Sequence, residues 1–435
     1  MSGDPRRDGG VAAEAIARAE ALLKQGDRDG AAAIVNEVLA RSPNDADALH
    51  LSGVIAVRNN AHADAVAAFR AAITQRPRSP RSWMALGNVL ARDGDYANAA
   101  AAYREVLADE PASADATFNL GQMQKRLGQH DQAIRSFHAA WLADPMLFDA
   151  AKQCVASIAS LVREGGRIAA TPARASPAAV DPGVFVSIVI CSIEPSKLDR
   201  AVALYRRAFA GMHHEIIAIR DARSLAEAFN WAARRSIADV LVMSHDDVDI
   251  IAGDFAERLL DHLRTFDAVG VVGSTRMDGP AVGWSGHPYL RGWITHRAAG
   301  EASWRVDVLD PRPVSADIAI LDGVFVAAKR EVFRAVPYDA TTFDGFHLAD
   351  LDWSYRASQA GFKLGVVGDL LLVHESRGNY DATWQRYADR FSAKHAAGVT
   401  PPAPSSFFGA TLDGADQARA FFEVLDGLHR GGQDA

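Results

Sequence analysis

Three aspartates, Asp246, Asp247 and Asp249, follow a largely apolar run at residues 239–243. Carboxylates this close along the chain repel one another unless a cation or several hydrogen-bond donors compensate their charge. Hard divalent cations such as Mg²⁺ and Mn²⁺ prefer carboxylate oxygen and often bind a substrate's phosphates as well. The alternative is a helix cap, since aspartate is favoured before a first helical turn, but a cap needs only one aspartate. The cluster therefore predicts a divalent-metal site.

A second acidic pair, Asp350 and Asp352, lies further along the chain. If this stretch is helical, Asp352 and Arg356 stand four residues apart and can pair on one face, whereas Asp350 points elsewhere. A carboxylate held near a reaction centre can remove a proton from a substrate as a general base. The alternative is that Asp350 only caps the start of a solvated helix. Asp350 is thus a candidate base.

These residues need a scaffold that brings them together, and strands alternate with helices from residue 184 onward. Apolar, β-branched runs predict strands at residues 184–191, 215–219, 239–243 and 370–373, and apolar periodicity predicts helices at residues 198–210 and 225–232. This alternation predicts an α/β domain with a mostly parallel, doubly wound sheet. Ligands of such sheets bind beyond the carboxyl ends of the strands. The candidates there are Ser192, Glu194, Asp221 and the run 244–249, which includes His245.

The first third of the chain repeats with a period of 34 residues. The positions in phase are the prolines Pro43, Pro77, Pro111 and Pro145, the glycines Gly53, Gly87 and Gly121, the small residues Ala31, Ala65, Ala99 and Ala133, and the large residues Val35, Phe69, Tyr103 and Phe137. Gly26, Asn60, Gly94 and Gly128 fall where turns are expected, because glycine and asparagine tolerate a left-handed backbone. Each unit is therefore predicted to be a pair of helices that a proline ends.

The composition favours a soluble, intracellular protein of two domains. The chain has 435 residues, with 49% hydrophobic and 23% charged residues, and its net charge of -8 argues against a nucleic-acid partner. Two cysteines, Cys154 and Cys191, predict no disulfide framework, and neither a signal peptide nor a membrane span is expected. The cytoplasm is the expected compartment. Residues 165–183, rich in Ala, Pro and Gly, are predicted to be a linker.

With Trp83, Leu86 and Gly87 at the characteristic spacing, residues 12–147 resemble four tetratricopeptide repeats, followed by a capping helix at 148–164. The resemblance implies an α-solenoid whose concave surface binds a protein or peptide partner or mediates self-association. A rigid spacer is the alternative.

The second half carries a series of motifs in a fixed order: the strand followed by His245-Asp-Asp-Val, then Leu321-Asp-Gly-Val-Phe, Asp350-x-Asp352 with Arg356 and Gly361, and His374-Glu-Ser-Arg-Gly378. Together these motifs resemble inverting family 2 glycosyltransferases of GT-A fold, from about residue 184 to 394, and within them a bacterial branch with a His-Asp-Asp strand end. The resemblance implies a nucleotide-diphosphate sugar as donor and a Mn²⁺ or Mg²⁺ ion that neutralises the departing diphosphate.

By the same resemblance, Asp247 and Asp246 occupy the metal-binding motif, with Asp249 as a further candidate, and His374 matches a third metal or diphosphate contact. His245 stands where relatives carry the first aspartate, which is a departure. Ser192, Glu194, Asp221 and His245 are implied to contact the nucleotide sugar. Asp350 matches the general base, although Ala349 replaces a glutamate that many relatives have.

Trp284, Asp322 and Asp352 are candidates for the acceptor or sugar pocket. Trp284 lies in a Gly-rich, aromatic segment, residues 283–293, which is predicted to be a mobile loop that covers a sugar; ordinary packing is the alternative. The predicted domains are the repeats at 12–164, the linker at 165–183, the glycosyltransferase-like domain at 184–395 and a C-terminal extension at 396–435.

Two other functions compete with this prediction. His245 and Ala349 favour a non-catalytic repeat scaffold with a degenerate transferase domain. The second competing function is that of another metal-dependent enzyme that uses nucleotides, such as a nucleotidyltransferase. The sequence argues against it, because it has no Gly-x-x-x-x-Gly-Lys phosphate loop.

Overall fold

The computed structural model describes residues 5–168, 183–297, 303–375, 380–395 and 408–431. By its internal contacts the chain divides into two compact units, Met1–Ala150 and Ala151–Ala435. Most of the predicted linker, the end of the predicted motif at Gly378 and the start of the predicted C-terminal extension lie outside the described residues. No helix in the described ranges is both long and apolar enough to cross a membrane.

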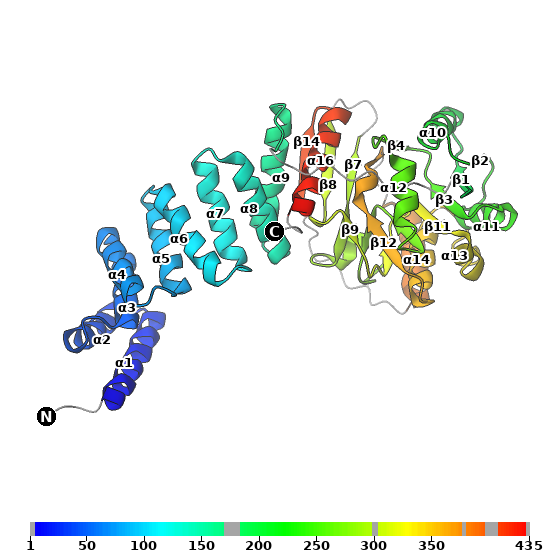
Figure 1. Cartoon of the computed structure of the whole chain (residues 1–435). Helices are drawn as coiled ribbons and strands as arrows, with labels where there is room; N and C mark the ends of the chain where they lie inside the picture. The colour runs from blue at the N-terminus through cyan, green and yellow to red at the C-terminus, as the bar shows by residue number, and fades with distance from the viewer. Residues whose placement is uncertain (1–4, 169–182, 298–302, 376–379, 396–407, 432–435) are drawn as a thin grey trace. The chain divides into compact units, whose positions relative to one another are not determined.

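The first unit is a stack of helical hairpins (Figure 1). Its helices are α1 (Pro5–Gln25), α2 (Arg28–Arg41), α3 (Ala46–Arg58), α4 (His62–Gln75), α5 (Pro80–Arg92), α6 (Tyr96–Asp109), α7 (Ala114–Arg126) and α8 (His130–Ala143). The next helix, α9 (Phe148–Arg163), spans the boundary between the two units.

The 34-residue period has a direct structural cause. The turn within each hairpin uses a residue of positive φ, as predicted: Gly26 at 88°, Asn60 at 57°, Gly94 at 82° and Gly128 at 74°. Three glycines let the paired helices approach, because a Cβ at Gly53, Gly87 or Gly121 would lie 2.6–2.8 Å from the ring of Phe69, Tyr103 or Phe137. The small residue of each unit is buried, and each proline lies two residues after the last residue of a helix.

The second unit contains a seven-stranded sheet in the order β2-β1-β3-β11-β5-β12-β9. Its strands are β1 (Val186–Cys191), β2 (His214–Ile219), β3 (Val240–Ser244), β5 (Ala268–Gly270), β9 (Val314–Ser315), β11 (Phe325–Lys329) and β12 (Leu364–Val367). The predicted α/β architecture is confirmed, with a parallel β2-β1-β3 half. The sheet as a whole is mixed, because β11 runs antiparallel to both β3 and β5, and β9 runs antiparallel to β12.

A second sheet has the order β10-β6-β7-β13-β4, and β8 joins β7 to a C-terminal strand. Its strands are β4 (Val248–Ile250), β6 (Val272–Ser274), β7 (Leu290–His296), β8 (Trp304–Val308), β10 (Ile320–Leu321), β13 (Leu372–His374) and β14 (Phe408–Leu412). The remaining elements are α10 (Pro195–Ala208), α11 (Leu225–Arg235), α12 (Phe255–His262), η1 (Val282–Ser285), α13 (Arg330–Ala335), α14 (Ala349–Gln359), η2 (Gly368–Leu370), α15 (Ala382–His395) and α16 (Ala415–Gly431).

One segment, which contains the 3-10 helix η1 and the start of β7, differs from its prediction. The expectation of a mobile loop at residues 283–293 is wrong, because Leu290–His296 forms β7, which is paired on both sides by other strands. Trp293 is 1% exposed and stacks on Phe422 of α16, with ring centroids 5.5 Å apart. Aromatic and glycine content alone does not distinguish a loop from a buried strand, and here the aromatic ring belongs to the core.

Candidate active site

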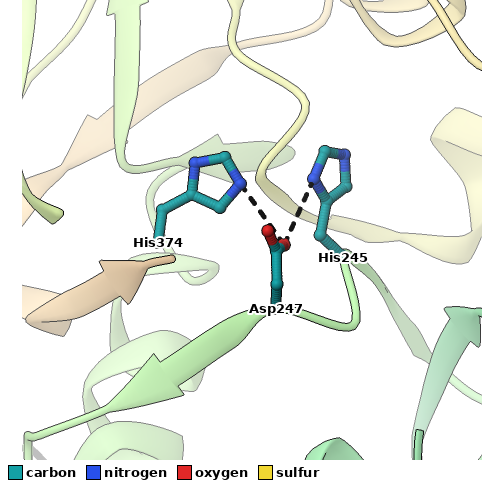
Figure 2. A group of neighbouring side chains, drawn as sticks. All are labelled: His245, Asp247 and His374. Carbon is teal, nitrogen blue, oxygen red and sulfur yellow. Dashed lines mark ion pairs between the residues drawn. The ribbon is translucent and has the colours of Figure 1, made fainter. Parts of the chain in front are cut away.

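Two histidines and an aspartate gather at the end of β3 (Figure 2). His245 follows β3 directly, Asp247 lies in the turn into β4, and β13 pairs with β4 so that its last residue, His374, lies opposite Val248. The Oδ1 atom of Asp247 is 3.3 Å from Nε2 of His374 and 3.8 Å from Nδ1 of His245. One ligand atom from each of the three residues lies within 4.8 Å of the other two.

The donor atoms of this group fit a divalent metal ion. Burial, and then the neighbouring His374, lower the pKa of His245, which keeps its imidazole neutral and able to donate a lone pair. Two imidazole nitrogens and one carboxylate oxygen form a set that transition metals bind better than Mg²⁺, which prefers oxygen alone. The backbone also holds the group, since the amide of Glu375 donates to the carbonyl of Asp247 at 3.0 Å.

The two other predicted metal ligands do not join this group. The carboxylate of Asp246 accepts a hydrogen bond from the hydroxyl of Ser192, which lies at the end of the neighbouring strand β1. Asp249 lies within β4, where its carboxylate accepts from the amide of Ile250 at 2.9 Å. Ser192 therefore meets the acidic run at the carboxyl ends of two parallel strands, through Asp246.

A cavity of about 500 Å³ extends beside the group. His245 and His374 line it together with Asp350 at the start of α14 and Asp322 after β10. The acidic and imidazole side chains come from distant parts of the sequence, yet they line one cavity. The remaining walls are largely apolar, and their larger side chains include Leu290, Ile294, Leu309, Phe346 and Trp384.

Asp350 is held in a cradle of backbone amides. Burial, and then the charge of Asp322, raise the pKa of Asp350, while amides of Asp350, Leu351 and Gly323 lower it by donating to the carboxylate; the net pKa is about 6. A Cβ at Gly323 would lie only 1.8 Å from the Oδ2 atom of Asp350, so this close approach requires glycine. The carboxyl group therefore has a fixed position and a raised proton affinity.

Asp352 occupies a different environment from Asp350. As expected from the four-residue spacing, Arg356 donates to its carboxylate at 2.8 Å. Lys394 and His395 of α15 bind the same carboxylate at 2.6 and 2.8 Å, and the side chain is fully buried. Asp352 is absent from the cavity lining within the described residues, so the structure gives it a place in an ion-pair cluster between α14 and α15.

Three further candidates also lie outside the described cavity lining. Glu194 precedes α10 and pairs with Lys197 at 2.7 Å. Asp221 is exposed after β2. Trp284 lies in η1 and approaches Trp384, with ring centroids 6.5 Å apart, and only the second of these two rings belongs to the lining.

The structure adds cavity residues that the sequence prediction missed. His296, Arg305 and Asp307 come from β7 and β8, and the Nε of Arg305 donates to Asp307 at 2.9 Å. His296 lies beside His374 because β7 and β13 pair in parallel register. The signal for this placement was the strand-favouring run Trp293-Ile294-Thr295, which the arginine and glycine before it obscured.

The fold consists of a helical repeat array followed by a mixed α/β domain, and comparison with known proteins gives the families. Residues 187–395 match the model of a glycosyltransferase-like family, and residues 16–80 and 84–145 match that of a tetratricopeptide repeat. The chain therefore carries a tetratricopeptide array followed by a glycosyltransferase-like family 2 domain. No curated protein matches the chain significantly.

Several solved structures of repeat proteins are similar to part of the chain. A crystal structure of MamA is 22% identical with a TM-score of 0.32, covering 33% of this chain and 83% of MamA. A structure titled as a functional characterization of Pseudomonas aeruginosa pilF is 19% identical with a TM-score of 0.34. The match covers 35% of this chain and 70% of that one. YrrB, titled a TPR protein with an unusual peptide-binding site, is 21% identical with a TM-score of 0.32. The match covers 34% of this chain and 75% of YrrB.

Proposed function

We propose that this chain is an inverting glycosyltransferase that moves a sugar from a nucleotide-diphosphate donor to an acceptor hydroxyl. The observation that carries the proposal is that Asp350 and the two histidines of the His245–Asp247–His374 group line a single cavity. A transferase of this kind needs a base for the acceptor and compensation for the leaving diphosphate at opposite ends of one sugar-sized space. The match of residues 187–395 to the glycosyltransferase-like family also supports it.

Asp350 is the proposed general base. Its pKa of about 6 leaves the carboxylate deprotonated at neutral pH, yet with a higher proton affinity than an exposed aspartate has. In the proposed reaction Asp350 takes the proton of the acceptor hydroxyl while that oxygen attacks the anomeric carbon. The amides of Gly323 and Leu351 hold the carboxylate in place, which removes the need to reorganise it during the reaction.

His245, Asp247 and His374 are the proposed metal ligands. A divalent ion held there would supply positive charge to the diphosphate as it leaves. The sequence predicted Mn²⁺ or Mg²⁺, and of these two ions the imidazole-rich donor set favours Mn²⁺. In this proposal His245 is a metal ligand at the position where relatives carry an aspartate. This role weakens the case for a degenerate transferase domain. Ala349 is fully buried in the core at the start of α14, where an ionised glutamate would be costly.

The repeats are proposed to recruit a protein or peptide partner. If the sugar acceptor is itself a protein, the recruited partner is that acceptor. Self-association through the repeats is the alternative use of the same surface. A bacterial cytoplasm remains the proposed compartment, and the free thiols of Cys154 and Cys191 agree with a reducing environment.

A screen of nucleotide sugars with Mn²⁺ or Mg²⁺ tests the proposal. We expect Mn²⁺-dependent hydrolysis or transfer of one donor, releasing a nucleoside diphosphate, and a fall of at least about 100-fold in Asp247→Ala because the leaving charge loses its compensation. Asp249→Ala is the matched control and should retain activity. Release of pyrophosphate would indicate a nucleotidyltransferase, and neither binding nor turnover of any donor would favour the scaffold.

A further inference from the structure

The cavity beside the proposed metal ligands contains one arginine. Among the described residues that line it, Arg305 of β8 is the only arginine or lysine. Its Nε atom donates to both carboxylate oxygens of Asp307, at 2.9 and 3.1 Å. Its terminal nitrogens, Nη1 and Nη2, have no hydrogen-bond partner among the described residues. The outer edge of the guanidinium can therefore donate to an external acceptor.

The pair of Arg305 and Asp307 does little for the fold. Both residues belong to β8 and stand two apart, so their hydrogen bonds join no two elements. Ion pairs with a partly exposed partner contribute little to stability. Asp307 is only 7% exposed, and burial of a carboxylate is costly unless its charge is compensated. A buried carboxylate that fixes an arginine on a cavity wall is instead what a preorganised binding site requires.

The neighbouring strand β14 leaves room for this pair. Asp307 lies opposite Gly409 in the antiparallel pairing of β8 and β14. A Cβ at Gly409 would lie 2.5 Å from Oδ1 of Asp307 and 2.8 Å from Nη2 of Arg305. Any side chain at this position would displace the carboxylate or the guanidinium. The absence of a side chain at Gly409 thus allows Asp307 to hold Arg305 where it is.

Arg305 lies in one row with a proposed metal ligand. His374 of β13 pairs with His296 of β7, and His296 pairs with Arg305. Residues paired in this way present their side chains on the same face of a sheet, and all three line the cavity. Because adjacent strands are about 4.8 Å apart, the backbones of His374 and Arg305 are separated by about 10 Å. A group bound by Arg305 is therefore separate from a diphosphate bound at the metal ligands.

The two other carboxylates of the cavity come from elements away from β8. Asp322 follows β10, which is three strands from β8 in the order β10-β6-β7-β8. Asp350 accepts a hydrogen bond from the amide of the next residue, Gly323. Their repulsion of an anion is therefore weakest beside Arg305, since it falls with distance. The cavity thus has the proposed base in one part and a fixed cation in another.

We propose that Arg305, fixed by Asp307, binds a carboxylate or phosphate group that the substrate carries apart from the donor's diphosphate. A guanidinium held at Nε presents its two terminal nitrogens as a planar fork, which matches two oxygens of such a group. The group belongs either to the transferred sugar, as in a uronic acid, or to the acceptor. The inference rests on the proposed transferase function and narrows its substrates to those with an acidic sugar or an acidic acceptor.

Calorimetric binding of matched ligands to the full-length chain tests this inference without turnover. One arm, with Mn²⁺, compares UDP-glucuronate with UDP-glucose and GDP-mannuronate with GDP-mannose. The other arm, without metal, compares phenyl glucuronide, phenyl glucoside and phenyl glucoside phosphorylated at its primary hydroxyl. We expect the acidic ligand of at least one arm to bind at least about tenfold more tightly than its neutral match. A preference among the nucleotide sugars assigns the group to the transferred sugar, and a preference among the glycosides alone assigns it to the acceptor.

Arg305→Gln should remove this preference by weakening the acidic ligand about tenfold while leaving the affinity for the neutral ligand unchanged. Arg312→Gln is the matched control, because Arg312 also binds an aspartate two residues away, Asp310, but lies outside the described cavity lining. The control should keep the preference. Circular dichroism and the thermal midpoint establish that both variants fold.

Two results would overturn the inference and leave the transferase function standing: nucleotide sugars that bind with no preference for an acidic ligand in either arm, or a preference that survives in Arg305→Gln. Binding of no nucleotide sugar would count against the transferase function instead. The glycoside arm needs no nucleotide, so a preference there that Arg305→Gln removes would still support the anion site. No preference there in that case would overturn it.

Discussion

Opposing effects act on the pKa of Asp350, and the resulting pKa affects both the proposed activity and the stability of the fold. Burial and the charge of Asp322 favour its protonated form, whereas three backbone amides favour the carboxylate. The first effect is larger, since the pKa rises from 3.8 to about 6. A carboxyl group whose pKa is higher in the folded than in the unfolded chain stabilises the fold while it is protonated in the folded state. That contribution is fully present below pH 3.8 and disappears as the pH rises through about 6.

Asp350→Asn should therefore stabilise the protein while inactivating it. At pH 8 we expect the free energy of unfolding to increase by about 1–2 kcal/mol, because the variant no longer carries a charge in an unfavourable site. The gain should shrink as the pH falls from 8 to 5. Urea unfolding at several pH values measures it, and kcat/KM of the wild-type chain should rise through about pH 6. Equal stability of the two proteins at pH 8 would contradict the raised pKa.

His245 shows how a single residue changes the chemistry of a motif. A histidine in place of an aspartate removes one negative charge from the end of β3, and its Nδ1 atom still faces Asp247. The neighbouring imidazole of His374, with ring centroids 5.5 Å apart, makes the group richer in nitrogen than an all-carboxylate site. These two rings are the reason why we propose Mn²⁺ rather than Mg²⁺ as the ion that this group would hold.

At the scale of elements, the position of Asp350 depends on the turn between β10 and β11 as much as on α14. Gly323 in that turn touches the carboxylate, and Leu348 before α14 adopts a left-handed conformation with φ of 65°. The turn and the helix start therefore fit together only while residue 323 has no side chain.

Gly323→Ala should displace the carboxylate of Asp350, because the new Cβ would lie 1.8 Å from it. We expect kcat to fall about 100-fold, the usual effect of a misplacement of about 1 Å in a catalytic group. Gly253→Ala is the control, since a Cβ there meets no atom within 4 Å. Steady-state kinetics of both variants measures the effect. Full activity of Gly323→Ala would show that the cradle does not position Asp350.

At the scale of the whole molecule, the C-terminal segment is part of the second unit. The strand β14 pairs with β8 along its length, from Phe408 opposite Val308 to Leu412 opposite Trp304. Phe422 of α16 is 1% exposed and stacks on Trp293 with the two rings nearly parallel, at 4°. The strands β7 and β8 that carry His296, Arg305 and Asp307 are thus supported by residues beyond the family match at 187–395.

Phe422→Ala should lower the free energy of unfolding of the second unit by about 3–5 kcal/mol, because it leaves a cavity beside Trp293. The neighbouring Glu423→Ala is the control and should change it by less than about 0.5 kcal/mol, since residue 423 is exposed. Thermal and urea unfolding followed by tryptophan fluorescence measures both. A loss no larger than that of the control would mean that α16 contributes little to the unit.

The sequence by itself determined features whose cause is local. The 34-residue period predicted the helical hairpins, and the left-handed turn residues and buried alanines followed from steric rules that act within one repeat. Apolar runs likewise located β1, β2 and β3, and the four-residue spacing of Asp352 and Arg356 predicted their pairing. In each case the interacting residues are close along the chain.

Only the tertiary structure decided which polar residues share a site. Asp350 and Asp352 are equal candidates by type, yet Lys394 and His395 of another helix bind one of them while the other faces the cavity. His296 joins the cavity because β7 pairs with β13, and the pairing of strands far apart in sequence depends on the packing of the entire unit. Long-range register and burial decide such roles, and neither is encoded in the spacing of nearby residues.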